Sequence, residues 1–307
     1  LDATENYPEP YYMLEYNGVP FSTLGGIQAI SGQKKNGKTF LLAQLMAAIL
    51  GVNSDRVSTY LPGLRIPERT LERLGHLPTV LYVDTEMEKL NSAKVLRRVH
   101  WLCGWQMDLP CERFHVLWLR SVTDTKDDKG TIIEKAHDRR YRLIKQAIDI
   151  LHPDAVFIDG IRDIIGDFND NEESSNLVTD LMALAEQRQI CIWNTLHMNP
   201  RPKNDDESKM RGHLGTELGN KITDTLVCVK HKDNGEVWTD SCCEFFLSLD
   251  GEAYYNIETT CITRMLIGYR AKGQEAIHAG DDVLSQVERH STLGTEPFEE
   301  RIGEKKW

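Results

Sequence analysis

The sequence lacks the long apolar stretches of a membrane protein. No run of about 18 apolar residues occurs in the 307-residue chain, so we expect no membrane-spanning helix. The first residues, LDATENYPEPYYMLEY, lack the basic-then-apolar order of a signal peptide. Internal repeats and low-complexity blocks are also missing. These absences predict a cytoplasmic protein with no membrane partner.

Cysteine and histidine patterns typical of disulfide frameworks or zinc sites are absent as well. The seven cysteines are scattered, odd in number and free of any C-x-x-C pair. Such usage indicates reduced thiols in a cytosolic protein. The ten histidines form no H-E-x-x-H motif and no other paired metal spacing. The chain is therefore expected to fold on its hydrophobic core, for which its length suffices.

Basic residues are fewer than acidic residues. Lys and Arg number 36 against 47 Asp and Glu, which gives a formal net charge of -11. This balance excludes a generally basic protein that coats nucleic acid. Any nucleic-acid site must therefore be a local patch.

Apolar runs with β-branched residues alternate with helical segments along the chain. The runs typical of buried parallel strands lie at 26–30, 79–84, 154–159 and 190–197. The helical segments lie at 40–50, 89–104, 131–151 and about 174–189, the last capped by Ser174 or Ser175. In the third segment the expected core contacts are Ile133, Ile144, Ala147, Ile148 and Leu151. Later strands are expected at DTLVCVKH, EFFLSL and YYNIE. This alternation predicts an α/β fold with a mostly parallel central sheet flanked by helices. We expect one domain over 1–270, opened by a short hairpin that turns at Asn17-Gly18, and a charged tail over 271–307.

A complete phosphate-loop motif follows the first buried strand. Residues 32–39 read Gly32-Gln33-Lys34-Lys35-Asn36-Gly37-Lys38-Thr39, which fits G-x-x-x-x-G-K-[ST]. The glycines let backbone N–H groups approach phosphate oxygens, and the next helix turns its positive N-terminus toward the same anion. Lys38 is expected to contact the β- and γ-phosphates, and Thr39 to bind Mg²⁺. Together with Phe40 these residues form the predicted ATP site, and an ordinary Gly-Lys turn is the alternative.

Two lysines inside the loop are unusual. Lys34 and Lys35 either add positive charge near the phosphates or point into solvent. The sequence favours neither interpretation.

An aspartate ends the strand AVFID. Asp159 is a candidate for the Mg²⁺ shell, opposite Thr39 and usually through water. The alternative is an Asp that begins a turn with Gly160. Because the phosphate loop precedes it in the chain, we favour the metal site.

Two further polar residues follow predicted strands. Glu86, after VLYVD, is the candidate base for an attacking water, with Asp84 and Glu88 as rivals. His197, at the end of ICIWNTLH, is a candidate contact to the γ-phosphate. A carboxylate at a helix N-terminus and a solvated strand-end histidine are the alternatives. Since ligands bind at the carboxyl ends of parallel strands, Lys38, Glu86 and His197 are predicted to form one catalytic site.

These strand ends together resemble a RecA-type P-loop ATPase, and more narrowly the RepA-like and DnaB-like hexameric helicase group of mobile genetic elements. The resemblance covers about 12–270 and is carried by TLGGIQAISGQKKNGKTFLLAQL, VLYVDTEME, PDAVFIDGIRDII, WNTLHMNP and RGHLGTELGNKITDTLVCV. It implies ATP and Mg²⁺ as cofactors and a homo-oligomeric ring or filament with ATP between subunits. A basic residue would then act in trans. Lys230 and Lys232 are the candidates, Arg264 is a weaker one, and a solvated strand-end lysine pair is the alternative.

The loops that bind single-stranded DNA in this group carry little positive charge here. The first, 166–176, has four acidic residues and no Lys or Arg, a charge of -4. The second, 200–211, has four basic and three acidic residues, a net +1. DNA affinity rests largely on phosphate neutralisation. The small positive charge of 200–211 therefore gives only weak support for single-stranded DNA as a partner.

Three functions are compatible with these features. The leading hypothesis is an ATP-hydrolysing RecA/RepA-like motor that acts on DNA in replication, mobilisation or transposition of a mobile element. The second, motivated by the acidic first loop, is an ATP-dependent switch or assembly factor that acts on a protein partner without unwinding. The third is a small-molecule kinase, which would need an arginine-bearing lid. Arg139, Arg140 and Arg142 cluster, but in a predicted helix where a solvated face is expected.

Overall fold

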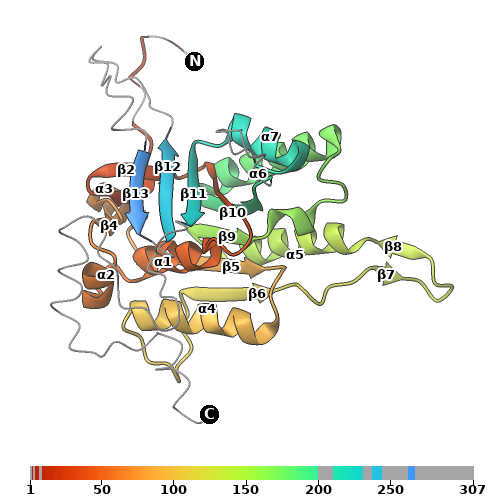
Figure 1. The fold of residues 1–307 in the computed structure, drawn as a ribbon, viewed down its shortest axis with the longest axis horizontal. Coiled ribbons are helices and arrows are strands. Elements are labelled where there is room, and N and C mark those ends of the chain that lie inside the picture. The colour runs from red at the N-terminus through yellow and green to blue at the C-terminus, as the bar shows by residue number, and fades with distance from the viewer. Residues whose placement is uncertain are drawn as a thin grey trace.

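An eight-stranded sheet forms the centre of the protein (Figure 1). The structure, a computed structural model, describes residues 2, 4–6, 9–199, 210–230, 237–243 and 262–266. The strands of this sheet are β3 (Ile27–Gly32), β5 (Val80–Asp84), β6 (Phe114–Trp118), β9 (Ala155–Asp159), β10 (Cys191–His197), β11 (Asp224–Lys230), β12 (Val237–Cys243) and β13 (Ile262–Leu266). Their order is β13-β12-β11-β3-β10-β9-β5-β6.

The part of the sheet from β11 to β6 is parallel throughout. At the other edge, β12 runs antiparallel to β11 and β13 antiparallel to β12. The predicted α/β fold with a mostly parallel central sheet is therefore confirmed. The carboxyl ends of the parallel strands lie together at one end of the sheet, and the phosphate loop leaves β3 at that end.

Helices cover both faces of the sheet (Figure 1). One face carries α1 (Lys38–Leu50) and α4 (Lys89–Leu102), and the other carries α5 (Ala136–Leu151), α6 (Asn171–Arg188) and α7 (Gly212–Lys221). Strand side chains alternate between the two layers: Tyr82 packs with the α1 layer, whereas Leu81 and Val83 pack with the α5 layer. Since both faces are buried, these strands read as continuous apolar runs in the sequence.

A small three-stranded sheet precedes the phosphate loop in the chain. It consists of β1 (Tyr12–Tyr16), β2 (Val19–Thr23) and β4 (Leu64–Arg65), in the order β2-β1-β4. Asn17 and Gly18 both have positive φ angles, 50° and 83°, as a two-residue type I′ hairpin turn requires. The predicted hairpin is confirmed. The short helices α2 (Asp55–Tyr60) and α3 (Glu68–Leu74) flank β4 in the chain.

The helix predicted over 131–151 begins five residues later than expected. Before it, β8 (Ile132–Glu134) pairs with β7 (Thr125–Lys126), and this hairpin projects away from the body of the protein (Figure 1). The backbone N–H of Ala136 donates to the Asp124 carboxylate at 2.7 Å, where α5 starts. Ile133, expected in the core, is 65% exposed, so that prediction was wrong. Ile144 and Ile148 are buried as predicted.

The acidic loop predicted over 166–176 is shorter than expected. Helix α6 starts at Asn171, and Asp170 is its N-cap: the Asp170 carboxylate accepts a hydrogen bond from the Glu173 backbone N–H at 2.8 Å. The predicted cap at Ser174 or Ser175 was therefore wrong. Carboxylates are favoured in the first turn of a helix, which accounts for the acidic sequence at this point.

The later part of the chain is described in fewer pieces. The predicted strands EFFLSL and YYNIE, the second loop at 200–209 and the tail over 271–307 lie outside the described residues. The division at residue 270 therefore stays a prediction. Among the helices that the structure describes, none combines the length and apolar character needed to cross a membrane.

Arg140 binds three backbone carbonyls from two segments of the chain instead of facing solvent. Its guanidinium donates to the carbonyls of Leu119 at 3.3 Å, Val122 at 3.0 Å and Asp163 at 3.1 Å. Asp163 lies in the 3-10 helix η1 (Ile161–Ile164), directly after β9. The solvated face predicted for this arginine cluster was wrong at Arg140, because its planar, multi-donor guanidinium reaches three carbonyls at once.

We expect Arg140→Met to lower the free energy of unfolding by about 2 kcal/mol, because three backbone carbonyls lose a charged donor. Urea denaturation would measure it. The matched control is Arg142→Met on the same helix, which breaks an exposed ion pair with Glu134 and should have a much smaller effect. Equal losses in the two variants would contradict the role given to Arg140.

Candidate active site

The phosphate loop leaves β3 where the backbone of β11 comes very close. Gly32 pairs with Cys228 of β11, and a Cβ at Gly32 would lie 2.8 Å from the Cys228 carbonyl oxygen. There is consequently no room for a side chain at this position. On the other side of β3, Gly32 pairs with His197 of β10. The loop is thus held between two neighbouring strands.

The loop ends at the N-terminus of α1. Gly37 is the N-cap residue with φ 81°, a conformation that favours glycine. Within the described part of the chain, no side chain caps this helix and no acidic residue lies in its first turn. The N–H groups of a first helical turn have no partner within the helix, and together with the helix dipole they make this end suitable for an anion. The structure therefore fits a phosphate group at the predicted loop.

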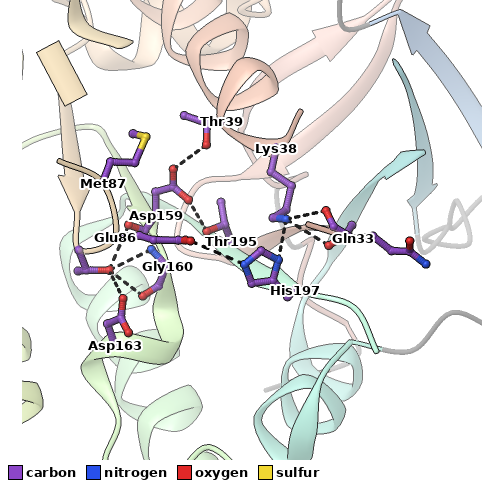
Figure 2. Close-up of polar contacts among 12 residues, drawn as sticks. Gln33, Lys38, Thr39, Glu86, Met87, Asp159, Gly160, Asp163, Thr195 and His197 are labelled. Atoms are coloured by element: carbon purple, nitrogen blue, oxygen red, sulfur yellow. Dashed lines mark hydrogen bonds and ion pairs between the residues drawn. The ribbon is translucent and has the colours of Figure 1, made fainter. Parts of the chain in front are cut away.

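Lys38, His197 and Glu86 form a connected row across the site (Figure 2). The Lys38 Nζ donates to the carbonyls of Gly32 at 3.1 Å and Gln33 at 3.2 Å, and it lies 3.0 Å from His197 Nδ1. His197 Nε2 lies 4.0 Å from Glu86 Oε1. Because an ammonium group only donates, the contact between Lys38 and His197 requires Nδ1 as the acceptor. The structure brings the three predicted catalytic residues together.

The charges in this row shift two pKa values. The pKa of Glu86 is lowered, chiefly by its interaction with His197 and further by the charges of Lys38 and Lys34, while burial opposes the shift. Glu86 is therefore ionised at neutral pH. Burial lowers the pKa of Lys38, which the charges of Asp159 and Glu86 oppose. Lys34 and Lys35 are both exposed, and Lys34 makes the smallest of the contributions that lower the pKa of Glu86, so their part in the site stays open.

The other two candidate bases, Asp84 and Glu88, make contacts away from His197. Asp84 is buried, and its carboxylate accepts from the backbone N–H groups of Glu86 at 3.0 Å and Met87 at 2.8 Å and from the Ser92 hydroxyl. Glu88 lies 3.7 Å from Arg120 at the surface. Glu86 has a 57% exposed side chain and points toward His197 (Figure 2), so the geometry favours it as the base.

Asp159 lies at the end of β9, beside the first turn of α1. The Thr39 hydroxyl donates to its Oδ2 at 3.1 Å. Burial raises the pKa of Asp159; the neighbouring charges of Asp84 and Glu86 add to the increase, and hydroxyl hydrogen bonds oppose it. A nearby cation would stabilise the ionised carboxylate. Hydroxyl and carboxylate oxygens are ligands that Mg²⁺ prefers, directly or through water, so Thr39 and Asp159 fit the expected metal.

The sequence analysis missed three hydroxyl-bearing residues around Asp159. Thr195 and Tyr82 donate to its carboxylate, and the Thr85 hydroxyl accepts from the Gly160 N–H at 3.2 Å and donates to Asp163 at 2.9 Å. Each is a polar or partly polar residue inside a buried strand or directly after one. That placement was the available signal, but the contacts join different strands and need the sheet order.

The trans-acting candidates stay predictions. Lys230 is the last residue of β11, Lys232 lies outside the described residues, and Arg264 lies on β13.

Comparisons with known proteins bear on this site. The sequence model of the AAA domain family matches residues 16–200, more than half of the chain. The chain belongs to the AAA domain family. The matched span contains the phosphate loop, Glu86, Asp159 and His197. Together with the sheet and the phosphate loop, this membership fits an α/β P-loop protein of the RecA-like fold class.

The other comparisons give less information about the function of this AAA domain protein. A model of carbohydrate-binding family 9 matches residues 218–307, less than half of the chain and mostly outside the described residues. No curated protein matches the sequence. A solved structure of a KaiC-like protein from the hyperthermophilic archaeon Pyrococcus horikoshii OT3 is similar, with 13% identity and a TM-score of 0.44, over 77% of this chain and 88% of that chain. This likeness is too distant to bear on function.

We expect Gly32→Ala to weaken nucleotide binding by roughly tenfold or more, because the added methyl group meets the Cys228 carbonyl and the loop must shift. Titration with a fluorescent ATP analogue would measure the affinity. The control is Gly130→Ala, where φ is +82° and nothing lies within 4 Å of an added Cβ. If both variants bind as tightly as the parent, the close approach at Gly32 has no role in the site.

Proposed function

We propose that this AAA domain protein hydrolyses ATP and acts as a RecA/RepA-like motor on DNA, in replication, mobilisation or transposition of a mobile element. The observation that supports hydrolysis best is the row of Lys38, His197 and Glu86, which come from the first turn of α1, the end of β10 and the segment after β5. An ionised carboxylate, a buried ammonium and an imidazole at one phosphate loop suit transfer of a phosphoryl group to water.

Each residue has a defined part in this reaction. Glu86 orients a water molecule and accepts its proton, for which its lowered pKa keeps it ionised. Lys38 leaves the carbonyls of Gly32 and Gln33 and contacts the phosphates, and His197 contacts the γ-phosphate. Thr39 and Asp159 would hold Mg²⁺, which would neutralise phosphate charge.

We also propose that the protein forms a homo-oligomeric ring or filament, with Lys230 or Lys232 completing the ATP site of a neighbour. The RecA-like fold supports this proposal. A small-molecule kinase would need an arginine-bearing lid. Arg140 binds backbone carbonyls and Arg142 pairs with Glu134, so these arginines do not form one.

Substitutions at the loop and the base test hydrolysis. Lys38→Ala should abolish phosphate release, because the phosphates lose their buried cation. Glu86→Gln should lower turnover by roughly 100-fold or more while ATP stays bound, because only the base is removed. Phosphate release and equilibrium binding of ATP would be measured side by side. Glu88→Gln is the matched control and should keep near-parental turnover; normal turnover in Lys38→Ala would overturn the proposal.

A local basic patch beside the site supports DNA as the partner. The guanidinium groups of Arg162 and Arg211 lie 4.5 and 5.5 Å from the ring of Phe168, and both arginines are exposed. The Arg211 backbone N–H donates to the His197 carbonyl at 2.9 Å. The patch is thus bonded directly to the residue proposed to contact the γ-phosphate. Counting charges within 166–176 missed Arg162, which precedes that segment.

If DNA is the partner, it should stimulate ATP turnover in a salt-dependent way. Single-stranded DNA should raise ATP turnover at low salt, and the effect should fade as salt increases, because phosphate contacts release counterions. Arg162→Ala and Arg211→Ala should each reduce the stimulation without changing basal turnover. Arg188→Ala, which removes an exposed arginine paired with Asp149, is the control and should leave it intact.

An ATP-dependent switch that acts on a protein is the second candidate. Acidic residues favour it: Asp167, Glu172 and Glu173 lie beside the basic patch and would repel DNA phosphates. Turnover that DNA leaves unchanged, and that a protein partner raises, would favour the switch over the motor.

A further inference from the structure

Three hydroxyl groups from three different elements converge on the Asp159 carboxylate. Thr39 of α1 donates to Oδ2 at 3.1 Å, Tyr82 of β5 to Oδ2 at 3.4 Å, and Thr195 of β10 to Oδ1 at 2.7 Å (Figure 2 shows Thr39 and Thr195). Thr39 belongs to the phosphate-loop motif. Tyr82 and Thr195 lie on the two strands that flank β9 in the sheet, and no motif of the sequence accounts for them.

The arrangement leaves the carboxylate one orientation. Thr195 holds Oδ1, and the other two hydroxyls lie on the opposite oxygen, so rotation of the carboxylate would break the short bond to Thr195. Asp159 and Thr195 are both almost fully buried, and water does not replace a lost donor easily there. A fixed carboxylate presents its free lone pairs in one direction.

The chemical nature of the donors matters as much as their positions. A lysine or arginine at hydrogen-bond distance would hold the carboxylate equally well, but it would also neutralise its charge and repel a cation. Hydroxyl groups orient the carboxylate and leave its negative charge available. Outer partners of this kind tune metal sites by fixing the ligand or the water that it holds.

Thr195 also links two parts of the site. It lies two residues before His197 on β10, and residues two apart in a strand share one face. The strand that carries the proposed γ-phosphate contact therefore also holds the proposed metal-site carboxylate. A displacement of β10 would move both groups together.

We propose that Thr195, assisted by Tyr82, is a positioning residue that holds the Asp159 carboxylate ready for Mg²⁺ and so sets the Mg²⁺ requirement of nucleotide binding. This inference rests on the proposed ATP function. Thr195 should contribute more than Tyr82 to holding the carboxylate. Thr195 makes the shorter hydrogen bond and is the hydroxyl donor to Oδ1, whereas Tyr82 shares Oδ2 with Thr39.

The test compares hydroxyl-deleting variants in a Glu86→Gln background, where ATP is bound without turnover. Thr195→Val keeps the shape of the side chain and removes its hydroxyl, Thr195→Ser restores the hydroxyl, and Tyr82→Phe removes one oxygen atom. The matched control is Thr70→Val: Thr70 is 1% exposed, Thr195 is 3% exposed, and the Thr70 hydroxyl also donates over 2.7 Å, but to the Tyr12 carbonyl in the small sheet. The readout is the Mg²⁺ concentration that half-saturates binding of a fluorescent ATP analogue, beside its affinity in EDTA.

Thr195→Val should raise the half-saturating Mg²⁺ concentration by roughly tenfold, and Tyr82→Phe by about two- to threefold, with the affinity in EDTA unchanged. Thr195→Ser and Thr70→Val should keep the parental value. An unchanged Mg²⁺ requirement in folded Thr195→Val overturns the inference. If Thr195→Val does not fold, Tyr82→Phe decides it: a raised value supports the inference and the parental value overturns it. Loss of all nucleotide binding in the Glu86→Gln parent would instead mean that the proposed ATP function fails.

Discussion

The parallel pairing of β10 with both β3 and β9 is the constraint on which the rest of the site depends. It places His197 beside Gly32 and Asn194 beside Ile158, one residue before Asp159. Strands in parallel register end at the same edge of a sheet, so the phosphate loop, the acidic strand end and the histidine meet without any long connection. A shift of one residue in this register would turn the inward side chains of β10 toward the opposite layer.

The electrostatics of the site follow from this packing. Asp84 and Asp159 are paired across β5 and β9, both buried, and Glu86 lies nearby. Lys38 is the buried cation that faces them, and burial already lowers its pKa. The protein stabilises these carboxylates with N–H and O–H donors, which occupy some of their lone pairs and leave a net negative charge. Such a site suits the joint binding of a divalent cation and a phosphate, because each offsets the charge that the other brings.

Where the sequence-based predictions were wrong, a tertiary contact outweighed a local pattern. The apolar spacing around Ile133 resembles a helix, yet Ile133 lies on β8, which pairs with β7, and the Asp124 carboxylate accepts a hydrogen bond from the backbone N–H of Ala136, where α5 begins. Arg140 lies in a charged run typical of a solvated face, yet it binds three carbonyls from segments far from it in sequence. The wrong cap of α6 has a local cause instead: Asp170 rather than a serine is the N-cap, since an aspartate serves as well at that position.

The sequence by itself determined the fold class, the phosphate loop and the polar residues that end the buried strands. Those features are local: a strand, a glycine-bearing turn and a helix follow one another within about 25 residues, and each has its own periodicity. Tertiary structure alone decided which side chains meet. The choice of Glu86 over Asp84 and Glu88, the row through His197 and the hydroxyl groups on Asp159 all join residues from different strands. Their distances depend on strand order and register, which long-range packing sets and no short stretch of sequence contains.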